Sequence, residues 1–275
     1  MGVERSSQYV LGGTRTEQQR LLSQAEDYQP HTRSLLANIK IQRGWRVVDI
    51  GCGPIGILDL LSESVGPEGE VVGLEREPRF VEMARLEVAK RRLKNVRILQ
   101  ADALHNGLEK NSFDLVHERL VMINLSARDV LLSEMVSLAR PGGTVVLEDV
   151  DNVSWLCEPA HPSWHVLLDT FHAVHKAGGG DGFIGRRLRG YLRTVGLSNV
   201  QTNVHVETIG LGQYRRTHLV SLLDSIRDKV IAMGLLTEEA LREHMDSLVK
   251  HLENPDTTVM DKLLVQAWGQ KPSLS

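Results

Sequence analysis

The sequence predicts an α/β fold in which strands alternate with helices. The first observation is the stretch Val47 to Gly56, reading VVDIGCGPIG, where an apolar strand runs into a turn with glycines at 51, 53 and 56. Glycine has no Cβ and reaches φ values that other residues avoid, so such a turn lets the backbone approach a ligand closely. The second observation is a helical stretch from about Ile57 to Val65, followed by a second apolar run over residues 71–74. Together they predict one βαβ unit.

Acidic residues stand at the ends of three predicted strands. Asp49 ends the first strand, Glu75 ends the second, and Asp102 follows the third, Val96 to Leu99. Glu75 is placed to accept two hydrogen bonds from the vicinal hydroxyls of a ribose, and Asp102 is placed to accept one from an exocyclic adenine amine. The pattern therefore predicts a site for a nucleotide cofactor at the carboxyl ends of the strands.

The alternation continues with a fourth strand, Phe113 to Val116, then a helix that ends at Arg140 before a Pro-Gly-Gly turn, and a fifth strand, Thr144 to Leu147. With the motifs DIGCG, GLE, QADA, FDLV and RPGG in this order, residues 30–210 resemble the class I S-adenosylmethionine-dependent methyltransferases. The segments YVLGGTRTEQQRLLSQA and DGFIGRRLRGYLRTVGL look like those of the small-molecule methyltransferases of secondary metabolism.

This resemblance implies a doubly wound, Rossmann-like sheet of seven strands, mostly parallel with the last strand antiparallel. It also implies S-adenosyl-L-methionine as the cofactor. On these motifs, the residues expected to bind the cofactor are Asp49, Gly51, Cys52, Gly53, Glu75, Arg76, Asp102, Ala103, His117 and Tyr28.

The glycine turn departs from the family pattern in one respect. The usual turn is GxGxG, whereas here Ile55 takes the place of the last glycine and Gly56 follows it. The resulting GxGxxG spacing is the dinucleotide fingerprint, so an NAD-dependent oxidoreductase is an alternative. Asp49, just before the turn, favours the methyltransferase type, because an acid there is suited to holding the methionine end of the cofactor.

The chain is divided by these patterns into an N-terminal helical cap, residues 1–42, and a methyltransferase domain, residues 43–275. The apolar positions of residues 16–42 predict two helices broken near Pro30 that cover the cofactor cleft. Tyr9 in this region is a candidate for substrate binding.

The segment after the fifth strand, residues 150–180, is expected to shape the substrate pocket because it leaves the sheet beside the cofactor. With Tyr9, the candidate substrate-binding residues are Arg119, Trp155, His161 and Trp164. His161 and His165 are four residues apart, and His172 and His175 are three apart, but no cysteine or carboxylate completes a metal pattern, so no metal is expected.

A helical insertion is predicted over residues 213–254, before the last strand, Val259 to Trp268. It reads as two amphipathic helices. Such an insertion suits either a lid over the substrate or a surface for a homodimer, and the sequence does not choose between them.

Methyl transfer from a sulfonium is an in-line displacement on an activated carbon, so the protein mainly has to position the two reactants. A base is needed only if the acceptor must lose a proton. His117, at the end of the fourth strand, is the first candidate, with His165 and Asp149 as further candidates. A role for His117 in cofactor contact or packing is the alternative.

Composition narrows the function further. The chain has 275 residues, 41% of them hydrophobic, with a net charge of −3, so nothing in its overall charge attracts nucleic acid. The two cysteines do not indicate a disulfide framework, and no apolar run is long enough to span a membrane, which favours the cytoplasm.

The expected function is therefore methylation of an O, N, S or C atom of a small, apolar organic molecule. The alternatives are a protein of the same fold that methylates a peptide or protein, one that promotes a non-methylating cyclisation, and the NAD-dependent oxidoreductase.

Overall fold

The computed structural model describes residues 15–273, with side chains from residue 21 onward. Its centre is a sheet of seven strands in the order β3-β2-β1-β4-β5-β9-β7. The bounds are β1 Arg46–Ile50, β2 Glu70–Glu75, β3 Val96–Gln100, β4 Phe113–Arg119, β5 Ala139–Asp151, β7 Ser198–His205 and β9 Leu263–Gln270. Strands β1 to β5 are parallel, and β9 lies antiparallel between β5 and β7. The predicted seven-stranded sheet with an antiparallel last strand is confirmed.

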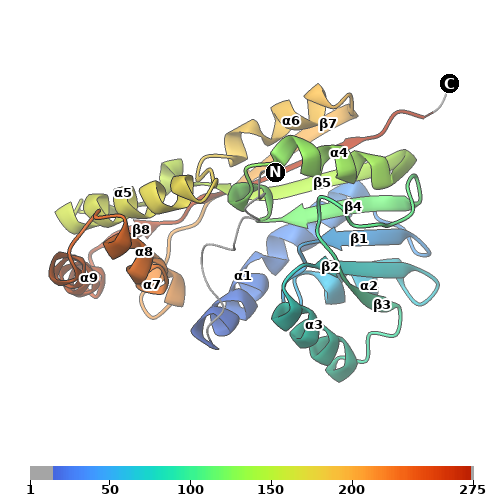
Figure 1. Ribbon diagram of the computed structural model, residues 1–275. Coiled ribbons are helices and arrows are strands. Elements are labelled where there is room, and N and C mark those ends of the chain that lie inside the picture. The colour runs from blue at the N-terminus through green and yellow to red at the C-terminus, as the bar shows by residue number, and fades with distance from the viewer. Residues whose placement is uncertain (1–14, 274–275) are drawn as a thin grey trace, which may run out of the picture.

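Alternate residues of the strands face two separate helical layers, which is why the sheet is covered on both sides. On one side, Val48 and Val72 pack with α4 (Arg128–Leu138) and α6 (Leu188–Thr194). On the other side, Val47 and Val71 pack with α2 (Leu58–Val65), and α3 (Pro78–Lys90) lies beside it. Figure 1 shows α4 and α6 above the sheet and α2 and α3 below it. A parallel sheet buried on both faces needs this apolar pattern.

A second, smaller body stands beyond the carboxyl ends of the parallel strands, at the left of Figure 1. We call it the cap. It contains α5 (Pro162–Ala177), α7 (His218–Ser225), α8 (Arg227–Ala232), α9 (Glu238–Leu252) and the paired strands β6 (Leu156–Glu158) and β8 (Thr258–Met260). The cap has its own hydrophobic core, in which the apolar stripes of the insertion pack against α5. The insertion therefore brings three α-helices, not two, to the segment that follows the fifth strand.

Helix α1 spans Arg15–Ile39 without a break, so the expected interruption near Pro30 is wrong. Proline lacks an N–H and removes one helical hydrogen bond. The turns after it are held by packing, because Leu35 and Leu36 are buried against the sheet and the Thr32 hydroxyl donates to Glu148 at 2.9 Å. Helix α1 lies between the cap and the sheet in Figure 1.

The predicted last strand, Val259 to Trp268, is divided in the structure. Its first part belongs to β8, which pairs with β6 in the cap, and its second part is β9, which pairs with β5 in the sheet. Asp261 and Lys262 form the junction, where the Asp261 N–H donates to the Glu207 carbonyl. This short stretch is one of the connections between the cap and the sheet.

Four 3-10 helices complete the described part of the fold. Short 3-10 helices span Met122–Asn124 (η1), Asn152–Ser154 (η2), Gly185–Arg187 (η3) and Tyr214–Thr217 (η4). Within residues 15–273, the helices all lack the length and apolar character needed to cross a membrane.

The separate core of the cap can be tested with Leu223, which is fully buried on α7. We expect Leu223→Ala to lower the free energy of unfolding by about 2 to 5 kcal/mol, because it leaves a cavity. As a control, Leu235→Ala removes an exposed leucine of the same insertion and should change the free energy of unfolding by less than about 0.5 kcal/mol. Denaturant unfolding followed by circular dichroism measures both, and equal losses would show that α7 is not packed as described.

Candidate functional site

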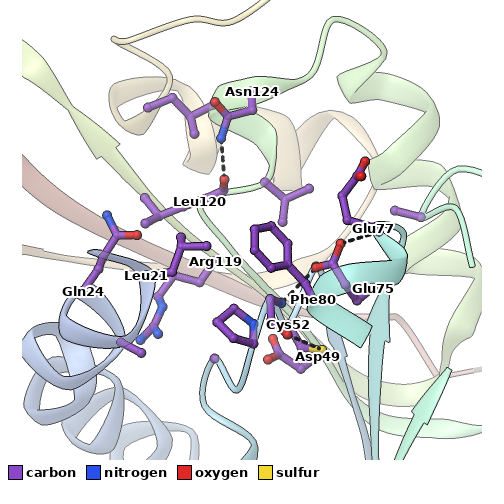
Figure 2. Close-up of a pocket in the computed structure, with 18 of the residues that line it drawn as sticks. Leu21, Gln24, Asp49, Cys52, Glu75, Glu77, Phe80, Arg119, Leu120 and Asn124 are labelled. Carbon is purple, nitrogen blue, oxygen red and sulfur yellow. Dashed lines mark hydrogen bonds between the residues drawn. The ribbon is translucent and has the colours of Figure 1, made fainter. Parts of the chain in front are cut away.

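A cavity of about 250 Å³ opens at the carboxyl ends of β1 to β4, enclosed by α1 and the cap. Figure 2 shows side chains reaching it from α1, from the glycine turn after β1, and from the end of β2. Crevices at the carboxyl ends of a doubly wound sheet are the usual ligand sites of such folds. The cavity is therefore the candidate functional site.

The glycine turn forms one wall of the cavity. Gly51, Gly53 and Gly56 have φ values of 69°, 56° and 50°, a region that side chains with a Cβ avoid. A Cβ at Gly56 would lie 2.6 Å from the Cys52 carbonyl oxygen and 2.8 Å from Asp49 Oδ2. Gly56, the glycine at the shifted position of the motif, is therefore required because the Cys52 carbonyl and the Asp49 carboxylate leave no room for a side chain.

Glu75 holds the turn from the neighbouring strand. Its Oε2 accepts from the Gly53 N–H at 2.9 Å, and its Oε1 accepts from the N–H groups of Arg76 and Glu77 at 2.8 and 2.9 Å. Burial raises the pKa of this carboxyl, although the three N–H donors oppose the shift. Two carboxylate oxygens offer about four lone-pair sites, so capacity for a ligand hydroxyl remains.

The structure brings together nearly all the residues expected to bind the cofactor. Those that line the cavity are Asp49, Gly51, Cys52, Gly53, Glu75, Arg76, Asp102, Ala103 and Tyr28. They come from the ends of adjacent strands and from α1. Only His117 of the expected set does not line the cavity.

His117 lies beneath the cavity, fully buried between two carboxylates. Its Nδ1 is 2.7 Å from Asp49 Oδ1 and its Nε2 is 2.8 Å from Glu148 Oε1. Glu148 also accepts from the Thr32 hydroxyl of α1 and, at 2.7 Å, from Gln266 Nε2 of β9. We call Asp49, His117 and Glu148 the buried triad.

The triad keeps His117 protonated. Burial by itself lowers the pKa of His117, but the hydrogen bonds and charges of Asp49 and Glu148 outweigh it and raise the pKa to about 9. The same ion pair acts on Glu148. Burial by itself would raise the pKa of Glu148, but the hydrogen bond and charge of His117 hold this pKa below its usual range. An imidazolium with both nitrogens engaged has no lone pair for a proton, so this geometry favours a structural role for His117.

The other candidate bases lie away from the cavity. His165 is exposed on α5. Asp149 is buried and accepts from the Ile123 N–H at 3.0 Å, while its neighbour Glu118 accepts from the Val121 N–H at 2.9 Å. Burial raises the pKa of Glu118 to about 7, and burial with the charge of Glu118 raises that of Asp149. These two carboxyls support η1, which lines the cavity, and do not enter it.

The expected substrate residues are divided between the cavity and the cap core. Arg119 lines the cavity, with its guanidinium 5.7 Å from the centre of the Tyr28 ring. Trp155 and Trp164 pack edge to face within the cap core, and His161 caps the first turn of α5 by accepting from the Ser163 N–H. Tyr9 lies outside the described residues.

The cap instead presents residues that the sequence analysis did not select as substrate-binding residues. The newly found lining residues are Phe171, His175, His218, Leu222 and Lys262 from the cap and its junction, and Ile123, Asn124 and Leu125 from η1 and the residue after it. Phe171 and His175 are four residues apart on α5, a spacing that places them on one helix face.

Within residues 15–273, no three His, Cys, Asp or Glu side chains are grouped so that they could hold a metal.

Comparison with known proteins gives a family match. The family model described as a methyltransferase domain matches residues 41–177. The chain is 34% identical over 115 residues to a demethylmenaquinone methyltransferase of Geobacillus kaustophilus, covering 42% of this chain and 49% of that protein. The chain thus spans about half the length of the curated relatives it matches.

Solved structures share the fold. The YcgJ protein from Bacillus subtilis superposes with a TM-score of 0.58 at 17% identity, over 89% of this chain and 99% of that one. The [4+2]-cyclase SpnF superposes with a TM-score of 0.51 at 15% identity, over 89% of this chain and 82% of that one. At these identities the likeness concerns the fold alone.

The glycine turn generates a prediction with a matched control. Gly56→Ala should lower the free energy of unfolding by about 2 to 5 kcal/mol, because the new Cβ adds a clash with the Cys52 carbonyl to an unfavourable φ. Gly53→Ala has a similar φ but no atom within 4 Å of the new Cβ, so it should cost only about 1 to 2 kcal/mol. Denaturant titration measures the difference, and equal losses would contradict the described turn.

The buried triad generates a pH prediction. Because the pKa of His117 is raised in the folded state, its contribution to stability is complete below about pH 6.5 and is lost as the pH rises through about 9. Between pH 7 and pH 9 this loss amounts to about 2 kcal/mol. We expect this fall in the free energy of unfolding to disappear in His117→Gln and to persist in His165→Gln. A His117→Gln variant with the full fall would show that another group titrates.

Proposed function

The chain belongs to the class I S-adenosylmethionine-dependent methyltransferases, and we propose that it binds S-adenosyl-L-methionine in the cavity and methylates a small, apolar organic molecule. The observation that carries this proposal is the convergence of Asp49, Glu75 and Asp102 on one cavity beside a left-handed glycine turn.

The residues present fit this cofactor. Glu75 has lone pairs left for the ribose hydroxyls, Asp102 is suited to the adenine amine, and Asp49 beside the turn is suited to the methionine end. When bound, the cofactor supplies a methyl carbon that its sulfonium charge activates. The task of this chain is then to hold the acceptor in line with that carbon and to exclude water.

The walls on the side of the cap support an apolar acceptor. Ile123, Leu125, Val150, Phe171 and Leu222 line this part of the cavity. Pockets lined mainly by apolar side chains with a few polar groups bind small organic molecules. The curated relative named above is a methyltransferase for demethylmenaquinone, which agrees with an acceptor of this class.

The helical insertion serves, in this proposal, as a lid. Leu219, Leu222, Leu223, Ile226 and Val230 are buried in the cap core, so the apolar stripe they form is not available to a second subunit. A homodimer through residues 213–254 would have to use the exposed Ile231, Met233 and Leu235 instead.

Two buried free cysteines suit a reducing compartment, and we propose the cytoplasm.

The first experiment is isothermal titration of the purified protein with S-adenosylmethionine, S-adenosylhomocysteine and NADH. We expect the two sulfur compounds to bind in the micromolar range, about −8 kcal/mol, and NADH not to bind. Binding of NADH alone would establish the oxidoreductase alternative that the GxGxxG spacing left open. Binding of the sulfur compounds without methylation of any acceptor would favour a non-methylating reaction on the same fold.

The role of Glu75 provides a sharper test. Glu75→Ala should weaken S-adenosylhomocysteine binding by about ten- to a hundredfold, since charge-assisted hydrogen bonds contribute roughly 1.5 to 3 kcal/mol. Glu82→Ala removes the same charge from an exposed position on α3 and should leave the affinity unchanged. Unchanged affinity in Glu75→Ala, measured by the same titration, would place the ribose elsewhere.

A further inference from the structure

We propose that a basic groove at the end of the sheet opposite the cap binds an oligophosphate, a ligand with two or more linked phosphate groups. The groove has a volume of about 800 Å³. It lies where β2 begins at Glu70 and β3 begins at Val96, whereas the cofactor cavity lies at the carboxyl ends of the same strands. In Figure 1 the cap stands at the other end of the sheet from these strand starts. The inference is therefore independent of the function proposed for the cavity.

The first support is the charge of the groove. Cationic side chains outnumber the carboxylates that line it, although the chain as a whole has a net charge of −3. The cations are Arg43, Arg92, Lys94 and Arg97, and the carboxylates are Glu63 and Glu70. Several cations around one groove create a local positive potential, which favours a small ligand that carries several negative charges.

Both carboxylates of the groove are already paired with arginines. Glu70 accepts from Arg97 Nε at 2.6 Å and from Arg46 Nε at 2.7 Å. Glu63 lies 3.2 Å from a terminal nitrogen of Arg33 on α1. The negative charges of the groove are therefore compensated without the remaining three cations.

Those three cations, Arg43, Arg92 and Lys94, form no ion pair with any side chain that the structure describes. Glu68, on the turn between α2 and β2, does not line the groove and pairs with none of them. A guanidinium group presents a planar set of N–H donors that matches two phosphate oxygens, and an ammonium group adds a point charge. The donors for an oligophosphate are thus present and uncommitted.

The second support is that Asn95 fixes the two walls of the groove to each other. Its Nδ2 donates to the Gly66 carbonyl at 2.8 Å, and its Oδ1 accepts from the Ser62 hydroxyl at 2.5 Å. These contacts attach the loop that carries Arg92 and Lys94 to the end of α2. The groove is therefore formed before a ligand arrives, which lowers the cost of binding.

The wall formed by α2 also sets the position of Arg43. Gly66 has a φ of 67°, and a Cβ at this residue would lie 2.6 Å from Arg43 Nη2. The guanidinium group thus lies directly against the backbone of the turn. Shape, and not a carboxylate, holds it at the groove.

The third support is the backbone of Arg92. The N–H of Arg92 donates to the Ala89 carbonyl and that of Leu93 to the Val88 carbonyl, which is the Schellman arrangement at the end of α3. Arg92 occupies the left-handed position of this motif, with a φ of 55°, where glycine is usual. A side chain with a Cβ lowers stability there. An arginine at this costly position, with its side chain on the groove, supports a role in binding.

The test is isothermal titration of the full chain in magnesium-free buffer at low salt. The probes are sodium tripolyphosphate, ATP and a short single-stranded oligonucleotide. We expect tripolyphosphate and ATP to bind with dissociation constants below about 1 mM, and the affinity to fall as salt is added. Equal affinities would show that the groove binds the phosphates alone, whereas tighter binding of ATP would identify a nucleotide as the source of the phosphates.

Three outcomes would overturn the proposal. Absence of tripolyphosphate binding is the first. The second is competition with S-adenosylhomocysteine, which would place the phosphates in the cofactor cavity. The third is tighter binding of the oligonucleotide than of both other probes, which would assign the surface to nucleic acid. If S-adenosylhomocysteine itself does not bind, the proposed function fails, but the titrations with tripolyphosphate still test the groove.

Variants with a matched control locate the site. Arg92→Gly should weaken tripolyphosphate binding at least about fivefold, the equivalent of one exposed ion pair. It should not lower the melting temperature, because glycine is favoured at this φ. Lys94→Met should weaken binding to a similar extent. The control is Lys40→Gly, which removes the same charge at a φ of 60° outside the groove and should change the affinity by less than about twofold.

Unchanged affinity in both Arg92→Gly and Lys94→Met would overturn the proposed site. An equal loss in Lys40→Gly would show that tripolyphosphate responds only to the overall charge, and would also overturn it.

Discussion

The structure depends most on the ion pairs of the buried triad. His117 on β4 joins Asp49 on β1 to Glu148 on β5, and Glu148 reaches α1 through Thr32. All three side chains are withdrawn from water, so the imidazolium of His117 compensates much of the charge of its two carboxylate partners, and loss of His117 would leave both carboxylates buried without it. This constraint sets the position of Asp49 next to the glycine turn and fastens the helix that closes one side of the cavity. The cofactor end of the site is therefore part of the core of the sheet and is preorganised.

The other end of the cavity is built differently. The cap has its own core of aromatic and aliphatic side chains, and it touches the cavity through α5, α7 and the junction at Lys262. Because the cap packs mainly within itself, its cavity-facing residues can change without disturbing the sheet. The fold defines where chemistry takes place, whereas the lining residues define which chemistry.

Sequence reasoning was most successful where function depends on local geometry. The periodicity of the chain predicts where the strands end, and the sequence places three acids and the glycines at 51, 53 and 56 at or just after these ends. They meet at one cavity because parallel strands end at the same edge of the sheet. It was least successful in the segment after β5. Trp155 and Trp164 were chosen for their chemistry, but both pack in the cap core, because a large aromatic ring gains more from burial there. In the sequence, His175 stood out only through its spacing of three residues from His172, because its partner Asn124 is distant in the chain.

The sequence by itself determined the order of strands and helices, the glycine turn and the acidic strand ends, because each arises from short-range periodicity or from the conformational freedom of single residues. Only the tertiary structure decided that His117 is an imidazolium between Asp49 and Glu148, that α1 continues past Pro30, and that His175 and Lys262 face the cavity. These features depend on contacts between residues far apart in the chain. Protonation state and access to a cavity are set by such contacts, which no local pattern encodes.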